Sequence, residues 1–123
     1  MYQVSVEGHF DAAHYLRDYG GKCENLHGHR FKVVVGLKAT RLNKIGLAYD
    51  FVELKRHLGE VLSRFDHTSL NEVPPFDKIN PSSENIAVTI YDQIKGHFSR
   101  GVTLSYVEVW ESPESCVTYS PES

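Results

Sequence analysis

The stretch YQVSVEGHFDAAH at residues 2–14 alternates apolar and polar side chains along most of its length. Successive side chains of a strand point to opposite faces of a sheet, so a period of two predicts a strand with one buried face. The even positions are expected on that buried face, and the apolar ones among them are Tyr2, Val4, Val6, Phe10 and Ala12. The polar odd positions are expected to face solvent.

A second alternating stretch covers residues 28–39, where the odd positions are apolar from residue 31 onward. These residues are Phe31, Val33, Val35, Leu37 and Ala39, while Arg30, Lys32 and Lys38 fall on the other face. Residues 15–26 hold glycine, aspartate and asparagine, which are typical of loops. We therefore expect the two stretches to pair as a hairpin, with their apolar faces toward one core.

Two helices are expected after this hairpin. Asp50 is suited to an N-cap, and Glu53 three residues later completes a capping-box-like pair. Residues at helical spacing then predict an amphipathic helix of about four turns: Leu54, Leu58, Val61, Leu62 and Phe65. Residues 67–81 are expected to form a loop, and Ser82 or Ser83 to cap a second helix. The apolar stripe of that helix is Ile86, Ile90, Ile94 and Phe98.

The C-terminal part predicts a second pair of strands. Residues 102–111 and 115–119 are rich in β-branched and aromatic residues, and Ser112 and Pro113 suit the turn between them. The order strand, strand, helix, helix, strand, strand predicts an α+β fold. We expect a four-stranded antiparallel sheet with both helices on one face, in a single domain spanning residues 1–123.

Composition narrows the classes of function. The 13 Lys and Arg residues are outnumbered by 16 Asp and Glu residues, and the net charge of −3 argues against non-specific nucleic-acid binding. No run of apolar residues is long enough to span a membrane, and the N-terminus lacks the features of a signal peptide. Cys23 and Cys116 lie far apart with no CxxC pair, so we expect free thiols in a cytoplasmic protein.

Three histidines form a candidate metal site. His14 continues the buried even series of the first strand, and His27 and His29 continue the buried odd series of the second. The hairpin brings them together at one end of the sheet. Three neutral nitrogen ligands suit zinc and leave a fourth position open, as in catalytic zinc sites. The alternative is that the HisGlyHis segment caps the strand by chance. The histidines outside this group, His9, His57 and His97, are expected at the surface.

Candidates for proton transfer lie elsewhere in the chain. Cys23 precedes His27 in a loop that should pass the metal, where a nearby cation would favour its thiolate. Asp66 directly precedes His67 and can polarise it. Each also has a structural alternative, as a buried thiol or as an ordinary helix C-terminus. Glu111 ends an apolar strand and is either a surface charge or an acceptor for the N–H groups of a heterocycle.

Several short motifs occur in an order that resembles one known family. They are FDAAH at 10–14, CENLHGH at 23–29, DFxELK at 50–55, DHxxLN at 66–71 and PSSEN at 81–85. This set resembles the 6-pyruvoyl-tetrahydropterin synthase and 6-carboxytetrahydropterin synthase family. The resemblance implies a tunnelling fold, in which trimers close a barrel and two trimers stack as a homohexamer.

The resemblance also implies roles for single residues. It implies that His14, His27 and His29 bind zinc, and that Cys23 is the general base. It implies that Asp66 and His67 form the companion proton relay, in a site at a subunit interface, and that Glu111 anchors the pterin. Glu24, which directly follows Cys23, is a departure from the family pattern, because many members of the family lack a glutamate here. In one branch of the family a glutamate near this position replaces or accompanies the cysteine, and that branch releases 6-hydroxymethyl-dihydropterin for folate synthesis. The alternative is that Glu24 is a solvated loop carboxylate.

The expected function is a zinc-dependent 6-carboxytetrahydropterin synthase. Its substrate would be 7,8-dihydroneopterin triphosphate, and its product would feed queuosine-type 7-deazaguanine synthesis. Alternatives are the 6-pyruvoyl product, a dual-function enzyme that also releases 6-hydroxymethyl-dihydropterin, a non-catalytic zinc or pterin binder, and a small zinc hydrolase. Lys22, Arg30 and Lys32 are available for the triphosphate, but nothing in the sequence fixes them in the site.

Overall fold

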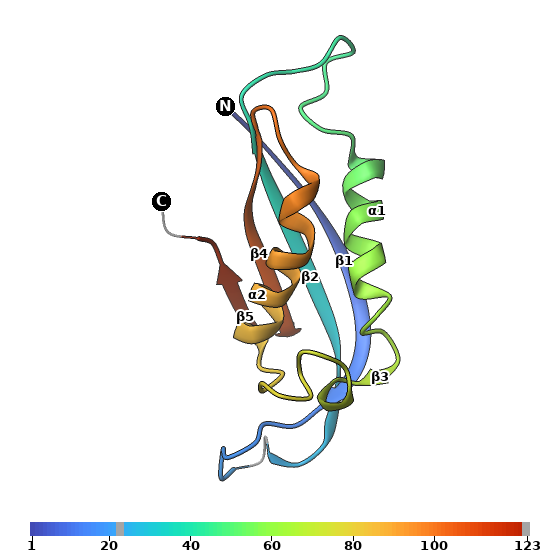
Figure 1. The fold of residues 1–123 in the computed structure, drawn as a ribbon, viewed down its shortest axis with the longest axis vertical. Coiled ribbons are helices and arrows are strands. Elements are labelled where there is room, and N and C mark those ends of the chain that lie inside the picture. The colour runs from blue at the N-terminus through green and yellow to red at the C-terminus, as the bar shows by residue number, and fades with distance from the viewer. Residues whose placement is uncertain (22–23, 122–123) are drawn as a thin grey trace.

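A computed structural model describes residues 1–21 and 24–121 of the chain. It contains one twisted sheet with two helices packed on one of its faces (Figure 1). The strand order is β3-β1-β2-β4-β5. The elements are β1 (Tyr2–His14), β2 (His27–Ala39), α1 (Phe51–Leu62), β3 (Thr68–Ser69), the 3₁₀ turn η2 (Leu70–Glu72), α2 (Ser83–Ile94), the 3₁₀ turn η3 (Lys95–His97), β4 (Val102–Ser112) and β5 (Ser115–Tyr119).

The β1–β2 hairpin forms the centre of the molecule and confirms the alternating pattern. The strands pair in antiparallel register from Tyr2 opposite Ala39 to His14 opposite His27. Apolar side chains at the predicted parity point toward the helices, where Phe10 and Phe31 stack with ring centroids 4.7 Å apart. Burying this apolar face against α1 and α2 supplies the main favourable contribution to folding.

Both helices begin where their caps predict. The Asp50 carboxylate accepts a hydrogen bond from the backbone N–H of Val52 at 2.9 Å. The Ser82 hydroxyl accepts one from Asn85 at 3.1 Å, which selects Ser82 as the cap of α2. The capping-box role of Glu53 is not borne out, since its carboxylate instead accepts from Arg56 on the next turn at 2.8 Å.

The predicted count of four strands is one too low. Residues 67–81 were expected to form only a loop, but Thr68 and Ser69 form β3, which pairs in parallel with Ala12 and Ala13 of β1. Two residues are too short to show a period, and their strand conformation depends on pairing with β1. The sheet is therefore antiparallel except at this edge.

The rest of the 67–81 segment is hydrogen-bonded to the residues that follow β1. The Asn71 side chain both accepts from the backbone N–H of Tyr15 and donates to its carbonyl, each at 3.0 Å. The Arg17 guanidinium donates to the carbonyl of Phe76 at 2.8 Å. These contacts hold the chain that leads into α2 against the end of the hairpin that carries the histidines. Within the described residues, no helix is long and apolar enough to cross a membrane.

Candidate metal centre

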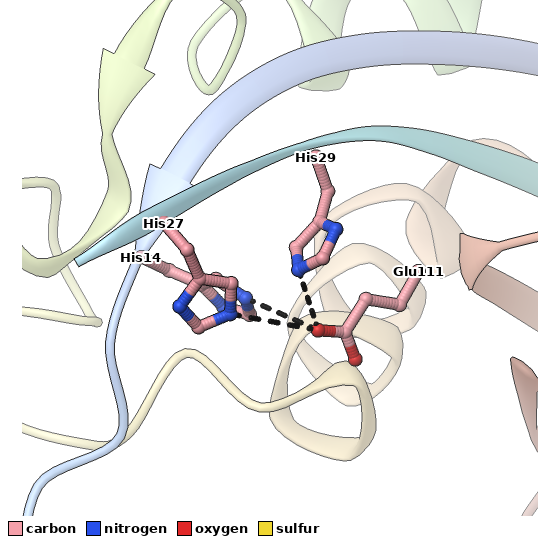
Figure 2. A group of neighbouring side chains, drawn as sticks. All are labelled: His14, His27, His29 and Glu111. Carbon is pink, nitrogen blue, oxygen red and sulfur yellow. Dashed lines mark ion pairs between the residues drawn. The ribbon is translucent and has the colours of Figure 1, made fainter. Parts of the chain in front are cut away.

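His14, His27 and His29 converge at one end of the β1–β2 hairpin, as their parity predicts. Their Nε2 atoms lie 3.4, 3.9 and 2.8 Å, respectively, from the same Oε1 atom of Glu111 (Figure 2). His14 is only 2% exposed, and the other two rings are partly buried. The four side chains thus present one donor atom each within a space that a single metal ion could occupy.

Two backbone carbonyls set the orientation of the imidazoles. His14 Nδ1 lies 2.8 Å from the carbonyl oxygen of Pro81, and His27 Nδ1 lies 2.6 Å from that of Asn25. A carbonyl can only accept, so Nδ1 carries the proton in both rings. Nε2 is then left with a free lone pair, which is the arrangement that outer hydrogen bonds impose on histidines bound to metals. These two carbonyls could not be predicted from the sequence, because backbone acceptors leave no mark in the residue pattern.

The surroundings favour neutral imidazoles. Burial lowers the pKa of His29, and the neighbouring His14 and His27 lower it further, although Glu111 acts in the opposite direction. A histidine must be deprotonated at its donor nitrogen to bind a metal. The Nε2 atoms of His14 and His29 are buried without a hydrogen-bond partner among the described residues, because Glu111 approaches without suitable geometry. Unpaired buried polar atoms cost free energy, and a shared ion would remove that cost. A metal therefore fits this group.

Glu111 reaches the histidines from the end of β4. It shares the core-facing parity of Val107 and Val109, and its side chain is 31% exposed. The hydroxyl of Ser83, in the first turn of α2, lies 3.5 Å from its second carboxylate oxygen. Glu111 is thus directed into the site rather than to the surface, and its parity with the two valines was a signal available in the sequence.

A cavity of about 220 Å³ is lined by three of the four side chains, His14, His27 and Glu111. Its walls come from the end of β1, the start of α2 and the β4–β5 hairpin, and include Leu16, Ser82, Ser83, Glu84 and Val117. Cys116 also lines it; this residue is exposed overall, and the partial desolvation of its thiol raises the pKa of that group. The arrangement offers hydroxyl groups and a carboxylate beside the candidate metal position, which suits a small polar ligand.

Asp66 and His67 belong to a different cluster, at the edge of β1. Asp66 accepts from the backbone N–H of Asp11 at 2.8 Å, and the N–H of His67 donates to the Asp11 carbonyl at 2.6 Å. Asp66 Oδ2 lies 3.1 Å from His67 Nδ1, and the His67 side chain is 78% exposed. The hydrogen bond from Asp11, then the charge of His67, lower the pKa of Asp66.

The structure therefore does not bring the predicted relay to the three histidines within one chain. Asp11 has odd parity and points away from the core, whereas His14 has even parity and points into it. The two clusters lie on either side of β1. Asp11 was not identified as a site residue from the sequence, although its place on the polar face beside the FDAAH motif was visible.

The prediction that His57 is a surface histidine is wrong. His57 is 7% exposed and stacks on His97 with ring centroids 3.9 Å apart. Its Nε2 lies 3.1 Å from the hydroxyl of Tyr49. Its position three residues after Leu54 places it on the buried stripe of α1, a spacing that the sequence contained. His9 and His97 are exposed, as expected.

Comparison with known proteins decides the family. A family model described as 6-pyruvoyl tetrahydropterin synthase matches residues 3–122. The chain belongs to the 6-pyruvoyl tetrahydropterin synthase family. The solved structure of the Caenorhabditis elegans 6-pyruvoyl tetrahydropterin synthase has a TM-score of 0.84 and 30% identity, covering 99% of this chain and 98% of that one. The fold is accordingly the tunnelling fold, as the sequence motifs imply.

Relatives within the 6-pyruvoyl tetrahydropterin synthase family carry different activities. A 6-carboxy-5,6,7,8-tetrahydropterin synthase of Bacillus subtilis is 30% identical over 129 residues, covering 98% of this chain and 86% of that protein. A dihydroneopterin monophosphate aldolase of Pyrococcus furiosus is 34% identical over 112 residues, covering 91% of each chain. The family is thus one of enzymes that act on pterins.

Two residues with roles expected from the 6-pyruvoyl tetrahydropterin synthase family precede β2 in the sequence. Cys23, the expected base, lies outside the described residues. Glu24 is exposed, and its backbone N–H donates to the carbonyl of Gly21 at 3.0 Å. Their roles, and that of Glu111 as the pterin anchor, stay predictions.

Proposed function

We propose that the protein is a zinc-dependent 6-carboxytetrahydropterin synthase. It would convert 7,8-dihydroneopterin triphosphate to 6-carboxy-5,6,7,8-tetrahydropterin for queuosine-type 7-deazaguanine synthesis. The observation that carries the proposal is the convergence of three imidazole Nε2 atoms, two of them with their tautomer set by a carbonyl, on one point beside the cavity. The Bacillus subtilis relative supports the choice of product.

His14, His27 and His29 would hold the zinc. Nitrogen donors in a set of three are the usual protein ligands of catalytic zinc. When bound, zinc supplies Lewis acidity to the side-chain oxygens of the substrate. Glu111 would accept N–H groups of the pterin's amino-pyrimidine edge, because its carboxylate lies in the wall of the same cavity. This pair of contacts would orient the substrate with its side chain toward the metal.

The proton transfers would use Cys23 and the Asp66–His67 pair. Cys23 would remove a proton from the substrate side chain as the general base. Asp66, whose carboxylate lies 3.1 Å from His67 Nδ1, would keep the proton on that nitrogen and leave Nε2 to exchange one with the substrate. Triphosphate would leave by elimination as the inorganic anion. The two outer side-chain carbons would leave as acetaldehyde when the C–C bond breaks in a retro-aldol-like step. With one water consumed, the remaining side-chain carbon becomes the carboxylate. The oxidation state changes only within the substrate, so no nicotinamide or flavin is needed.

An assembly would bring these groups together. The histidines face the core side of β1, whereas Asp66 and His67 lie at its edge beside an outward-pointing Asp11. A substrate held at the metal of one subunit would therefore meet the Asp66–His67 pair of another. We infer a homohexamer of two stacked trimers, in which the edges of neighbouring sheets pair and close a barrel. Such closure also removes exposed sheet edges.

Product analysis tests the proposal. Purified protein is incubated with zinc and 7,8-dihydroneopterin triphosphate, and the pterins are identified by mass spectrometry. We expect the 6-carboxy product, lost in His27→Ala and retained in His97→Ala, in which an exposed histidine is removed. A 6-pyruvoyl product would identify the alternative activity of the family. Binding of zinc or pterin without turnover would indicate a non-catalytic binder, and activity on simple esters or phosphates alone would indicate a hydrolase.

A second candidate activity is the release of 6-hydroxymethyl-dihydropterin. Two observations favour it: the presence of Glu24 and the similarity to the Pyrococcus furiosus dihydroneopterin monophosphate aldolase. If Glu24 is a second base, Cys23→Ala would keep zinc and lose the 6-carboxy product by about two to four orders of magnitude, the range for general acid–base groups. It would still release 6-hydroxymethyl-dihydropterin, which Glu24→Ala would remove selectively. Unchanged product ratios in Glu24→Ala would leave Glu24 as a solvated loop carboxylate.

A further inference from the structure

Arg17 lies three residues after His14, where the chain leaves β1, and its side-chain hydrogen bonds all reach one segment distant in sequence. Its guanidinium donates to the backbone carbonyls of Phe76 at 2.8 Å, Ile79 at 3.2 Å and Asn71 at 3.4 Å. The three carbonyls belong to the chain that leads into α2. A guanidinium is a planar fork with five N–H donors, so one side chain can bind several acceptors at once. Arg17 therefore stabilises one conformation of that chain.

The backbone of Arg17 is bound to the same segment. Its N–H donates to the side-chain oxygen of Asn80 at 2.9 Å, and its carbonyl accepts from the side-chain nitrogen of Asn80 at 3.1 Å. The backbone carbonyl of Asn80 accepts from the side chain of Asn85, in the first turn of α2, at 2.9 Å. These bonds fix the chain immediately before α2 relative to the end of β1.

Pro81, the residue after Asn80, connects this arrangement to the metal centre. Its carbonyl oxygen lies 2.8 Å from His14 Nδ1 and keeps the proton on that nitrogen. The proline ring restricts φ of Pro81, and Ser82 after it is fixed as the cap of α2. The place of the carbonyl therefore depends on how the preceding residues are held, and Arg17 holds them. Without the carbonyl, the proton of the neutral imidazole could shift to Nε2, and that nitrogen could then no longer bind a metal.

His14 depends on this support more than His27 does. At 2% exposure, His14 leaves no room for water to replace the carbonyl. The His27 side chain is 30% exposed, and its Nδ1 is held by Asn25, only two residues away in the sequence. The tautomer of His27 is thus set locally, whereas that of His14 is set by a contact distant in sequence. A change at Arg17 should therefore affect His14 and leave His27 as it is.

We propose that Arg17 is a positioning residue of the metal centre. It holds the Pro81 carbonyl against His14 Nδ1 and so keeps the Nε2 lone pair of His14 available to the ion. The inference rests on the proposed function in that a metal binds the three histidines, but it does not depend on which pterin product is formed. Loss of an outer hydrogen-bond partner typically lowers metal affinity by about 10- to 100-fold. Arg17 acts through the carbonyl, so the low end of that range is expected.

Zinc affinity, measured by competition with a chelator, is the first test. Arg17→Gln should weaken zinc binding about tenfold. Removal of a positive charge would by itself favour the binding of a cation, so weaker binding would report the lost hydrogen bonds. Arg17→Lys keeps the charge but not the fork, and should recover only part of the affinity. Arg41→Gln, which removes an exposed arginine beyond the far end of β2, is the matched control and should bind zinc as the wild type does.

A second measurement separates positioning from general stability. Nitrogen NMR of the zinc-free, full-length protein reports the tautomer of each imidazole. In Arg17→Gln we expect His14 to populate the tautomer protonated at Nε2, while His27 stays protonated at Nδ1. Ile94→Val removes one buried carbon atom at the other end of α2, so it should lower Tm without changing zinc affinity or either tautomer.

The outcomes distinguish this inference from the proposed function. Unchanged zinc affinity or an unchanged His14 tautomer in both Arg17 variants would overturn the inference. An equal loss of affinity in Ile94→Val would also overturn it, because Arg17 would then contribute to general stability only. If Arg17→Gln does not fold, the same criteria apply to Arg17→Lys. A wild type that binds no zinc would refute the inference and the proposed function together, whereas zinc binding that depends on Arg17 without turnover of pterins would uphold the inference and refute the proposed activity.

Discussion

His14, His27 and His29 converge beneath the start of α2, whereas Asp66 and His67 lie at the edge of β1, directly before β3. The first group is partly buried, with two tautomers fixed by carbonyls and a lowered pKa at His29. The second is exposed, with a lowered pKa at Asp66 and an ion pair to His67. Burial favours neutral imidazoles that can bind a metal, and exposure leaves His67 accessible to a ligand from outside the chain. In the proposed function, the same residue type therefore serves two kinds of chemistry according to its surroundings.

The largest effect is expected from removing a histidine of the buried group. His29→Ala should lower both zinc content and turnover below detection, because two ligands rarely retain a catalytic metal against dilution. Metal analysis and product formation are measured on the same preparation. His97→Ala, which removes an exposed ring after α2, should change neither. Full zinc content in His29→Ala would show that the ligand set is wrong.

A smaller effect is expected at the exposed pair. His67 has a φ of 59°, a left-handed conformation that asparagine tolerates well. His67→Asn should therefore fold and keep its zinc, yet reduce kcat by about two to four orders of magnitude, as expected for loss of an acid–base group. Arg100→Asn is the matched control, since Arg100 is exposed and has a φ of 56°. Loss of zinc in His67→Asn would remove the distinction between the two clusters.

The next prediction distinguishes two roles for Glu111, as an anchor for the pterin or as a fourth metal ligand. Glu111→Gln replaces an acceptor-only carboxylate by an amide that cannot accept N–H groups at both positions. If Glu111 anchors the pterin, KM should rise about 10- to 100-fold while zinc stays stoichiometric. Glu114→Gln, in the exposed β4–β5 turn, is the control. Weakened zinc binding in Glu111→Gln, measured by competition with a chelator, would instead make the carboxylate a fourth metal ligand.

The smallest effect concerns buried His57, which stacks on the exposed ring of His97. Burial first, then the charges of His97 and Arg56, lower the pKa of His57, while Glu53 and Glu60 oppose this; Tyr49 contacts its ring. Between that lowered pKa and the unfolded value near 6.5, the unfolded state binds more protons. Stability should therefore fall as pH drops below about 6.5.

His57→Gln should lose less stability over this pH range. The drop in Tm between pH 7.5 and pH 5 should be smaller in the variant than in the wild type by roughly 2–4 °C. Scanning calorimetry of the zinc-loaded proteins measures it. Equal pH dependence in the two proteins would contradict the assignment of the effect to His57. Zinc content should be the same in both, because two stacked rings without a third ligand do not form a metal site.

Much of the candidate metal centre could be predicted from the period of two in the sequence. The register that places His14 opposite His27 follows from the alternation of β1 and β2, and it brings the three rings together. The place of Asp66 and His67 could not be predicted. It depends on the turn after α1, where His67 takes a positive φ, and on backbone bonds to Asp11.

The remaining differences have equally local causes. β3 holds only Thr68 and Ser69, so no repeat marks it, and its pairing with β1 depends on tertiary structure. The stacking of His57 on His97 depends on tertiary structure, because it requires η3, which follows α2, to lie beside α1. The contact of Lys32 Nζ with the Trp110 ring depends on the register between β2 and β4, since a polar strand face by itself does not show which residues of the next strand lie beside it.

The hydrogen bond from His14 to the carbonyl of Pro81 has a thermodynamic consequence. Pro81 directly precedes Ser82, the cap of α2, so one bond links a metal ligand on β1 to the first turn of a helix remote in sequence. Local opening of that turn would release the His14 ring, and an ion bound to the ring would resist the opening. Occupancy of the centre and the opening equilibrium of the α2 N-terminus are therefore coupled by mass action. Amide hydrogens in the first turns of α2 should exchange more slowly as zinc is added, and the extent of slowing would report the affinity of the site.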